Sequence, residues 1–235
     1  MQISKETISL LSNFSEINTS IVIKTGNELK TISDMKNILA RTTVKEDFPL
    51  QFAIYDLPEF LNLASSSIFQ GADYDLGDES LQIEKDDARV TYWYAAEEII
   101  TSAPDKNINM PEGEVSFTLT KSKLKAITKM EGVLKKPDLA ILSSGENITL
   151  SVYDKKDPTS NTFNLDAGLG NGDTFSFLMK VHYLSKLLEG DYDVIISSEN
   201  ISHFSHKDLD LDYWIAIEPD STYNGKSFKK PLKDK

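Results

Sequence analysis

The sequence has 235 residues, of which 40% are hydrophobic, and a formal net charge of −12. This length fits one large domain or two small ones, and the hydrophobic fraction is too high for a disordered chain. The lack of cysteine excludes disulfides and thiolate sites and agrees with a reducing cytosol. The acidic net charge argues against DNA binding by the whole surface. No apolar run approaches the roughly 18 residues that span a bilayer.

The first half of the sequence predicts a leading helix, short strands and one strand–helix unit. The helix is expected near Ser4–Phe14, with Ser4 as its N-cap. The strand–helix unit spans Phe52–Ala64, where an apolar strand runs into Asp56, which can cap the helix that follows. The other expectations are a strand within Ile17–Lys24, a hairpin turn at Gly26-Asn27, a strand and then a loop in Leu29–Ala40, a short strand at Leu81–Ile83 and an aromatic strand at Arg89–Ala96.

The second half repeats this order at a period of about half the chain. A leading helix is expected at Lys121–Met130, a strand–helix unit at Phe175–Leu188, and an aromatic strand at Asp210–Ile217. The remaining strands are expected at Val115–Leu119, Asp138–Ser143, Asn147–Tyr153, around Phe163, at Asp193–Ser197 and at His203–Ser205.

This duplication predicts an α+β protein of two tandem domains. The first domain is expected at 1–110, with a linker rich in proline and asparagine at about 97–114, and the second at 111–223. The lysine-rich tail at 224–235 has nothing to bury and is expected to be frayed and flexible. Trp93 is expected in a core, with a domain or subunit edge as the alternative.

Positive charge is concentrated in one element. Residues 1–118 carry 9 basic and 20 acidic side chains, whereas residues 119–235 carry 16 and 17. Lys121, Lys125 and Lys129 follow i, i+4, i+8 spacing and form one helical stripe with no acid between them. Such a stripe suits a phosphate backbone, because it offers positioned charge without reading bases; a solvated lysine face is the alternative. Further bases that extend this charge are Lys135, Lys136, Lys180 and Lys186.

Three other stretches superficially resemble binding motifs but lack the residues or the context that those sites need. His203 and His206 have i, i+3 spacing but expected strand and loop surroundings, which do not suit a metal site. The alternating acids of Asp208–Asp212 lack the glycine and glutamate of a calcium loop. Gly168–Gly172 lacks the strand–turn–helix context of a dinucleotide site. The sequence therefore predicts no metal, no cofactor and no catalytic residue.

Four stretches together carry a resemblance to a known family. They are Ile3–Phe14 with Ile17-Asn18, Ala53–Leu57 with Phe60-Leu61, Tyr92-Trp93 with Ala95-Ala96, and Tyr213–Glu218 with Asp220–Thr222. In this order and spacing they resemble the sliding clamps of T-even-type bacteriophages, the processivity factors of the phage replicative DNA polymerase. The match spreads over residues 3–222, nearly the whole chain.

The resemblance implies a homotrimeric ring of clamp-type domains, with sheets outside and helices lining a hole for double-stranded DNA. The DNA-facing residues would be Lys5, Lys121, Lys125, Lys129, Lys135, Lys136, Lys180 and Lys186. Implied partners are a C-terminal peptide of DNA polymerase, an ATP-dependent clamp loader and a sigma-like factor of late transcription. The implied location is the cytoplasm of the infected bacterial host. The resemblance implies no enzymatic activity.

The sequence also fits two alternative functions. One is an acidic β-rich viral structural or interaction module that does not encircle DNA. The other is an enzyme that acts through carboxylates such as Asp208, Asp210 and Asp212. The duplicated helices with concentrated lysines favour the ring, because neither alternative requires them. A catalytic acid should also lie in a pocket with a perturbed pKa, whereas an Asp–Leu alternation predicts exposed acids.

Overall fold

Helix α1 (Lys5–Ser15) begins at the expected cap. The Ser4 hydroxyl accepts a hydrogen bond from the Thr7 backbone N–H at 3.2 Å. The Glu46 carboxylate also accepts two hydrogen bonds, from the Ser4 backbone N–H and from the Thr7 hydroxyl, each at 2.5 Å. Leu11 and Phe14 are fully buried, so the helix is fixed by its cap at one end and by its apolar face along its length.

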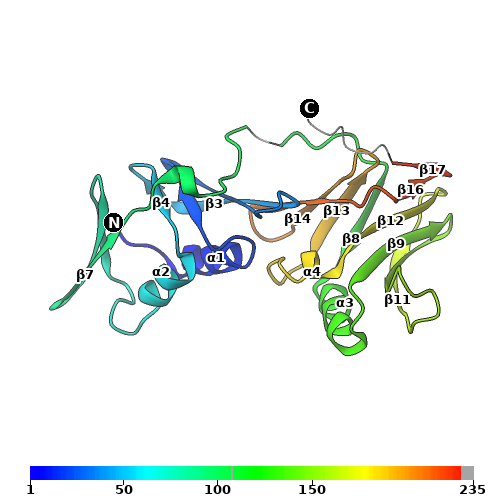
Figure 1. The fold of residues 1–235 in the computed structure, drawn as a ribbon, viewed down its shortest axis with the longest axis horizontal. Coiled ribbons are helices and arrows are strands. Elements are labelled where there is room, and N and C mark those ends of the chain that lie inside the picture. The colour runs from blue at the N-terminus through cyan, green and yellow to red at the C-terminus, as the bar shows by residue number, and fades with distance from the viewer. Residues whose placement is uncertain (107, 229–235) are drawn as a thin grey trace. The chain divides into compact units, whose positions relative to one another are not determined.

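The structure, a computed structural model, describes residues 1–106 and 108–228. The chain divides into two compact units, Met1–Asn107 and Ile108–Lys235, and the division lies inside the segment expected to be a linker. Figure 1 shows the helices and antiparallel strands of each unit.

Over residues 1–106, the first unit places four strands between its two helices and three strands after them. Strand β1 pairs antiparallel with β4, and β2 with β3. Strands β5, β6 and β7 form an antiparallel three-stranded sheet in that order. The bounds are β1 Ile21–Ile23, β2 Gly26–Ile32, β3 Ile38–Phe48, β4 Phe52–Ile54, α2 Leu57–Ala64, β5 Asp73–Leu76, β6 Ser80–Lys85, β7 Ala88–Trp93 and the 3-10 turn η1 Glu97–Ile99.

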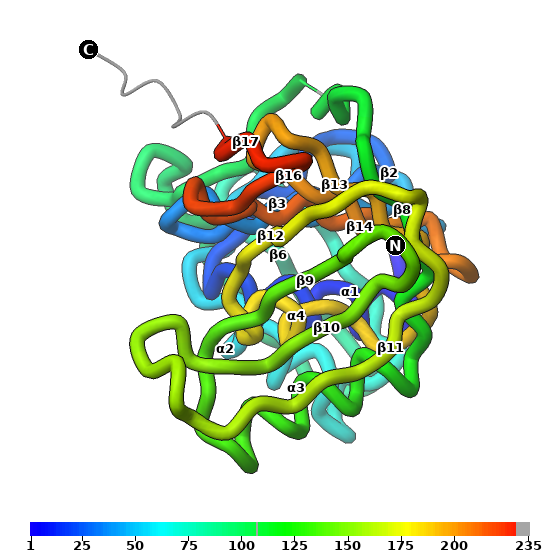
Figure 2. The backbone as a smooth tube through the Cα atoms, turned by 90° about the vertical axis from the view of Figure 1, so that its right-hand side faces the viewer, coloured from blue at the N-terminus to red at the C-terminus, as the bar shows by residue number. Residues whose placement is uncertain are grey.

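The second unit repeats this order. Strand β12 pairs with β9, as β4 pairs with β1, and β10 pairs with β11, as β2 pairs with β3. In Figure 2 strands β9, β10 and β11 run side by side, and α3 packs against β10, β11 and the second helix, α4. The bounds are β8 Val115–Leu119, α3 Lys121–Leu134, β9 Asp138–Ser144, β10 Asn147–Tyr153, β11 Phe163–Leu169, β12 Thr174–Lys180, α4 Val181–Leu184, β13 Tyr192–Ser197, β14 Ile201–His206, β15 Leu211–Ala216, β16 Thr222–Tyr223 and β17 Lys226–Ser227.

The duplication extends to the start of each unit, although only the second unit has a strand there. In the second unit β8 pairs with β13, the strand after the second helix. In the first unit Met1 takes that place, because its amino group donates to the Tyr74 carbonyl and its carbonyl accepts from the Tyr74 N–H, both at 2.7 Å. The predicted α+β class with two tandem modules is therefore confirmed.

Three local expectations are wrong. Gly26-Asn27 does not turn a hairpin, since β1 pairs with β4 instead of β2. Helix α4 ends at Leu184 instead of Leu188, because the N–H groups of Lys186 and Leu187 bond to carbonyls only three residues earlier, and the Leu188 N–H bonds to the Tyr213 hydroxyl at 3.1 Å. Trp93 is 67% exposed, so it is not a core tryptophan.

The expected frayed tail is also wrong for the part that the structure describes. Strand β17 pairs with β16, and Phe228 is only 6% exposed. Its ring lies 5.4 Å from the ring of Phe177, so this segment buries apolar surface in the second unit. The rest of the predicted tail, 229–235, lies outside the described residues.

Helix α2 provides a test of local capping. The Asp56 carboxylate accepts a hydrogen bond from the Glu59 N–H at 2.9 Å. Changing Asp56 to Ala is expected to lower the free energy of unfolding by about 1 kcal/mol, whereas Asp56→Ser should retain most of it. Urea denaturation followed by circular dichroism measures both. No loss in Asp56→Ala would show that the cap contributes nothing.

Candidate nucleic-acid interface

Helix α3 carries the predicted lysine stripe. The Thr120 hydroxyl caps it by accepting from the Lys123 N–H at 3.4 Å, and Leu124 and Ile127 are its buried residues. Lys121, Lys125 and Lys129 are all exposed, as the i, i+4, i+8 spacing predicts. The helix continues past the expected end at Met130 to Leu134, where Lys135 takes a left-handed conformation with φ of 55°.

Two of the three stripe lysines share one acid. The same carboxylate oxygen of Glu189 accepts from Lys121 and, at 2.7 Å, from Lys125. These hydrogen bonds hold the pKa of Glu189 below its ordinary value. Lys129 forms no ion pair with any residue that the structure describes. Glu189 was not among the predicted site residues.

The other predicted lysines lie in more varied settings. Lys5 is exposed near the start of α1, and Lys135 is exposed at the end of α3. Lys136 lies 3.7 Å from Asp154, and Lys186 is partly buried in the turn after α4. Of the eight candidates, the structure therefore brings Lys121, Lys125 and Lys129 onto one exposed face of one helix.

Lys180 belongs to a charge cluster at the end of the sheet. It pairs with Asp138, its partner in the β12–β9 register, and lies 3.5 Å from Glu218, which also pairs with Lys155. Burial opposes the ionisation of Asp138, but the hydrogen bonds from Lys180 and the Lys155 N–H outweigh it, so the pKa of Asp138 is lowered. Lys180 thus neutralises acids of its own unit.

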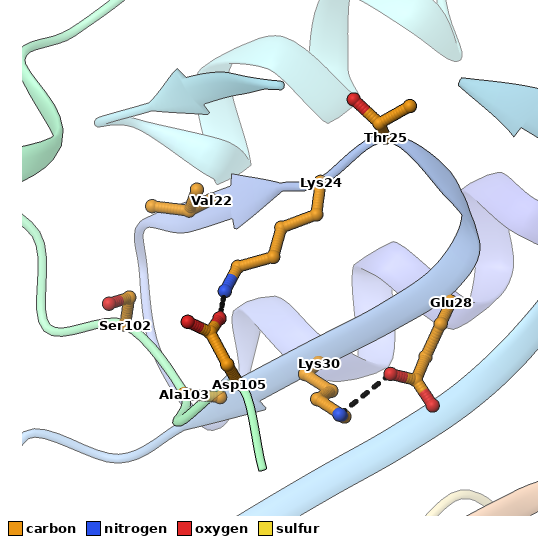
Figure 3. A pocket seen from close by; sticks show the side chains of 8 residues that line it. All are labelled: Val22, Lys24, Thr25, Glu28, Lys30, Ser102, Ala103 and Asp105. Carbon is orange, nitrogen blue, oxygen red and sulfur yellow. Dashed lines mark ion pairs between the residues drawn. The ribbon is translucent and has the colours of Figure 1, made fainter. Parts of the chain in front are cut away.

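A small cavity of about 140 Å³ lies in the first unit between β1, β2 and the segment that follows η1. Figure 3 shows Lys24 pointing to Asp105 and Lys30 pointing to Glu28 along its wall. Because each lysine in it already faces an acid, the cavity does not offer an open anion site.

The histidines and aspartates that superficially resembled metal or calcium motifs do not form such sites among the described residues. His203 and His206 lie on opposite faces of β14, since His203 bonds to Asp212 at 2.8 Å while His206 is buried. Asp208 and Asp210 are exposed. None of the described helices has the length and apolar character needed to cross a membrane.

Comparison with curated proteins relates this arrangement to known chains. The sliding clamp of Vibrio phage KVP40 is 32% identical over 225 residues, which cover 93% of this chain and 99% of that protein. The chain belongs to the sliding clamp family. The sliding clamps of Enterobacteria phage T4 and Escherichia phage RB69 are 26% and 25% identical, each over 95% of this chain and 100% of the relative. The resemblance to T-even-type clamps is therefore confirmed.

Solved structures of other proteins share this fold. The PCNA2–PCNA3 complex of Sulfolobus tokodaii contains a chain that matches 90% of this one over 95% of its own length, with a TM-score of 0.64 at 12% identity. The DNA polymerase III subunit beta of Borrelia burgdorferi matches 93% of this chain over 62% of its own, with a TM-score of 0.67 at 14% identity. No protein-family model matches the sequence.

Proposed function

We propose that this sliding clamp assembles into a homotrimeric ring that encircles duplex DNA and tethers a replicative DNA polymerase. The observation that carries the proposal is the exposed lysine face of α3 in a chain with a net charge of −12. Phosphate contacts by lysine are sequence-blind and let a protein slide, whereas contacts to base edges would hold it at one site. The chain contains only two arginines, Arg41 and Arg89, which fits such contacts.

The sheet edges support closure into a ring. Among the described residues, β7 pairs only with β6 and β11 pairs only with β10, so each leaves one edge with free backbone groups. A free edge is a template for pairing with another chain. Head-to-tail pairing of β7 with β11 of the next subunit would use both edges and generate a closed ring.

The partners follow from the same function. The clamp would bind a C-terminal peptide of the polymerase, be opened by an ATP-dependent loader and contact a sigma-like factor of late transcription. It would act in the cytoplasm of the infected bacterial host, without catalytic activity. Its hold on DNA would be topological, so retention should be sequence-independent and greater on circular DNA than on linear DNA.

Light scattering after size exclusion tests the ring. A closed trimer predicts a mass of about 79 kDa, three times the 26.3 kDa of the chain. A monomer that persists at high protein concentration would contradict the ring and favour an interaction module that does not encircle DNA.

Trp93 provides a sharper test of assembly, because it ends β7 and is 67% exposed. Trp93→Ala is expected to raise the concentration at which the trimer dissociates by at least about tenfold, as large aromatic residues dominate interface energies. Ile68→Ala is the matched control, since Ile68 is 60% exposed in the same unit but lies outside β7. Equal dissociation of both variants would exclude the Trp93 side chain from the interface.

A further inference from the structure

The contact between Glu189 and the lysine stripe has the form of an occupied anion site. One oxygen, Oε1, accepts from the ammonium groups of both Lys121 and Lys125. A backbone phosphate oxygen bound by two lysines would present the same acceptor to the same donors. The three side chains are 47% to 57% exposed, so an incoming phosphate can reach the lysines from solvent.

The residue before Glu189 is held by two buried tyrosines. The Leu188 N–H donates to the Tyr213 hydroxyl at 3.1 Å, and the Leu188 carbonyl accepts from the Tyr192 hydroxyl. Both tyrosines are 0% exposed. The backbone of Glu189 is therefore tied to the core of the second unit, and its carboxylate does not reach the lysines by the chance position of a loose loop.

The next two residues add to this constraint. A Cβ atom on Gly190 would lie 2.0 Å from the Nε2 atom of buried His206, so the chain can pass this close only as glycine. Asp191 then accepts a hydrogen bond from the backbone N–H of Lys121 at 2.6 Å, which joins the loop to the first turn of α3. The Glu189 loop is thus held in a fixed position next to the lysine stripe.

We propose that Glu189 is an internal phosphate mimic that occupies the site of Lys121 and Lys125 and competes there with the DNA backbone. This inference rests on the proposed function. Each phosphate that binds the two lysines must first displace the carboxylate, and the carboxylate returns when the phosphate leaves. Phosphate contacts at this position are thereby weakened and shortened, while Lys129 stays available. Such competition would favour sliding over tight static binding.

The test measures affinity for a fluorescent 30-base-pair duplex of random sequence by anisotropy at low salt. Glu189→Gln is expected to bind about threefold to tenfold more tightly, because one or two exposed ion pairs no longer have to be broken. Glu199→Gln is the control, since it removes the same charge from an exposed acid of the same unit. A gain in Glu189→Gln no larger than in Glu199→Gln would overturn the proposal.

A double-mutant cycle separates local competition from a general change in charge. In a chain with Lys121→Ala and Lys125→Ala, Glu189→Gln is expected to leave the affinity unchanged. A gain that persists without the two lysines would overturn the proposal, because Glu189 would then act only through long-range repulsion. Retention on circular DNA is measured separately on the unaltered chain, so failure of ring function is distinguished from failure of this inference.

Discussion

Changing Lys121, Lys125 and Lys129 together to Glu is expected to reduce DNA synthesis on a primed circular template to the product length of polymerase alone. The change replaces three positive charges on one exposed face of α3 by three negative ones, which repel the phosphate backbone. The fold should persist, because the ion pairs of Lys121 and Lys125 with Glu189 are exposed, and losing such a pair costs about 1 kcal/mol or less. Light scattering should still detect the proposed trimer.

A control with the same change in net charge tests whether the position matters. Lys36, Lys156 and Lys226 are exposed and lie outside the helices. Their joint change to Glu alters the net charge equally but should leave processive synthesis largely intact. Full-length products with the α3 variant, or equal loss with the control, would remove the lysine stripe from the DNA contact.

The helices were predictable from the sequence because their signals are local. Ser4 and Asp56 each cap a helix through a bond to the residue three positions later, and the apolar spacing marks the buried face. Strand partners are not local, which explains the error at Gly26-Asn27. Strand β1 pairs with β4 instead of the next strand, β2. No short-range sequence pattern identifies a partner that comes after two intervening strands.

The candidate site likewise has features that local sequence patterns predict and features that depend on tertiary contacts. The stripe of Lys121, Lys125 and Lys129 depends on helical spacing, so the sequence predicts it. The role of Glu189 depends on a loop held by Tyr192 and Tyr213, whose contacts follow from the folded sheet. The pairing of Lys180 with Asp138 arises from strand register, which also could not be predicted from residue types alone.

The buried aromatic cluster beside β16 and β17 is expected to show the largest effect on stability. Phe177 is 0% exposed, and its ring lies 4.9 Å from Phe175, 5.4 Å from Phe228 and 6.3 Å from Tyr223. Phe177→Ala would leave a cavity among these rings and is expected to lower the free energy of unfolding by about 3–5 kcal/mol. Urea denaturation at one fixed protein concentration measures the loss, since the proposed assembly would also add stability.

Two further variants decide whether this loss comes from the cluster. Leu209→Ala removes an apolar side chain that is 44% exposed between β14 and β15 of the same unit, and it should cost about 0.5 kcal/mol or less. Phe228→Ala should destabilise substantially by itself but add less in a chain that already carries Phe177→Ala, because neighbouring cavities are not independent. Strict additivity of the two changes would mean that Phe228 does not pack on Phe177, and the chain after β16 would then contribute nothing to this core.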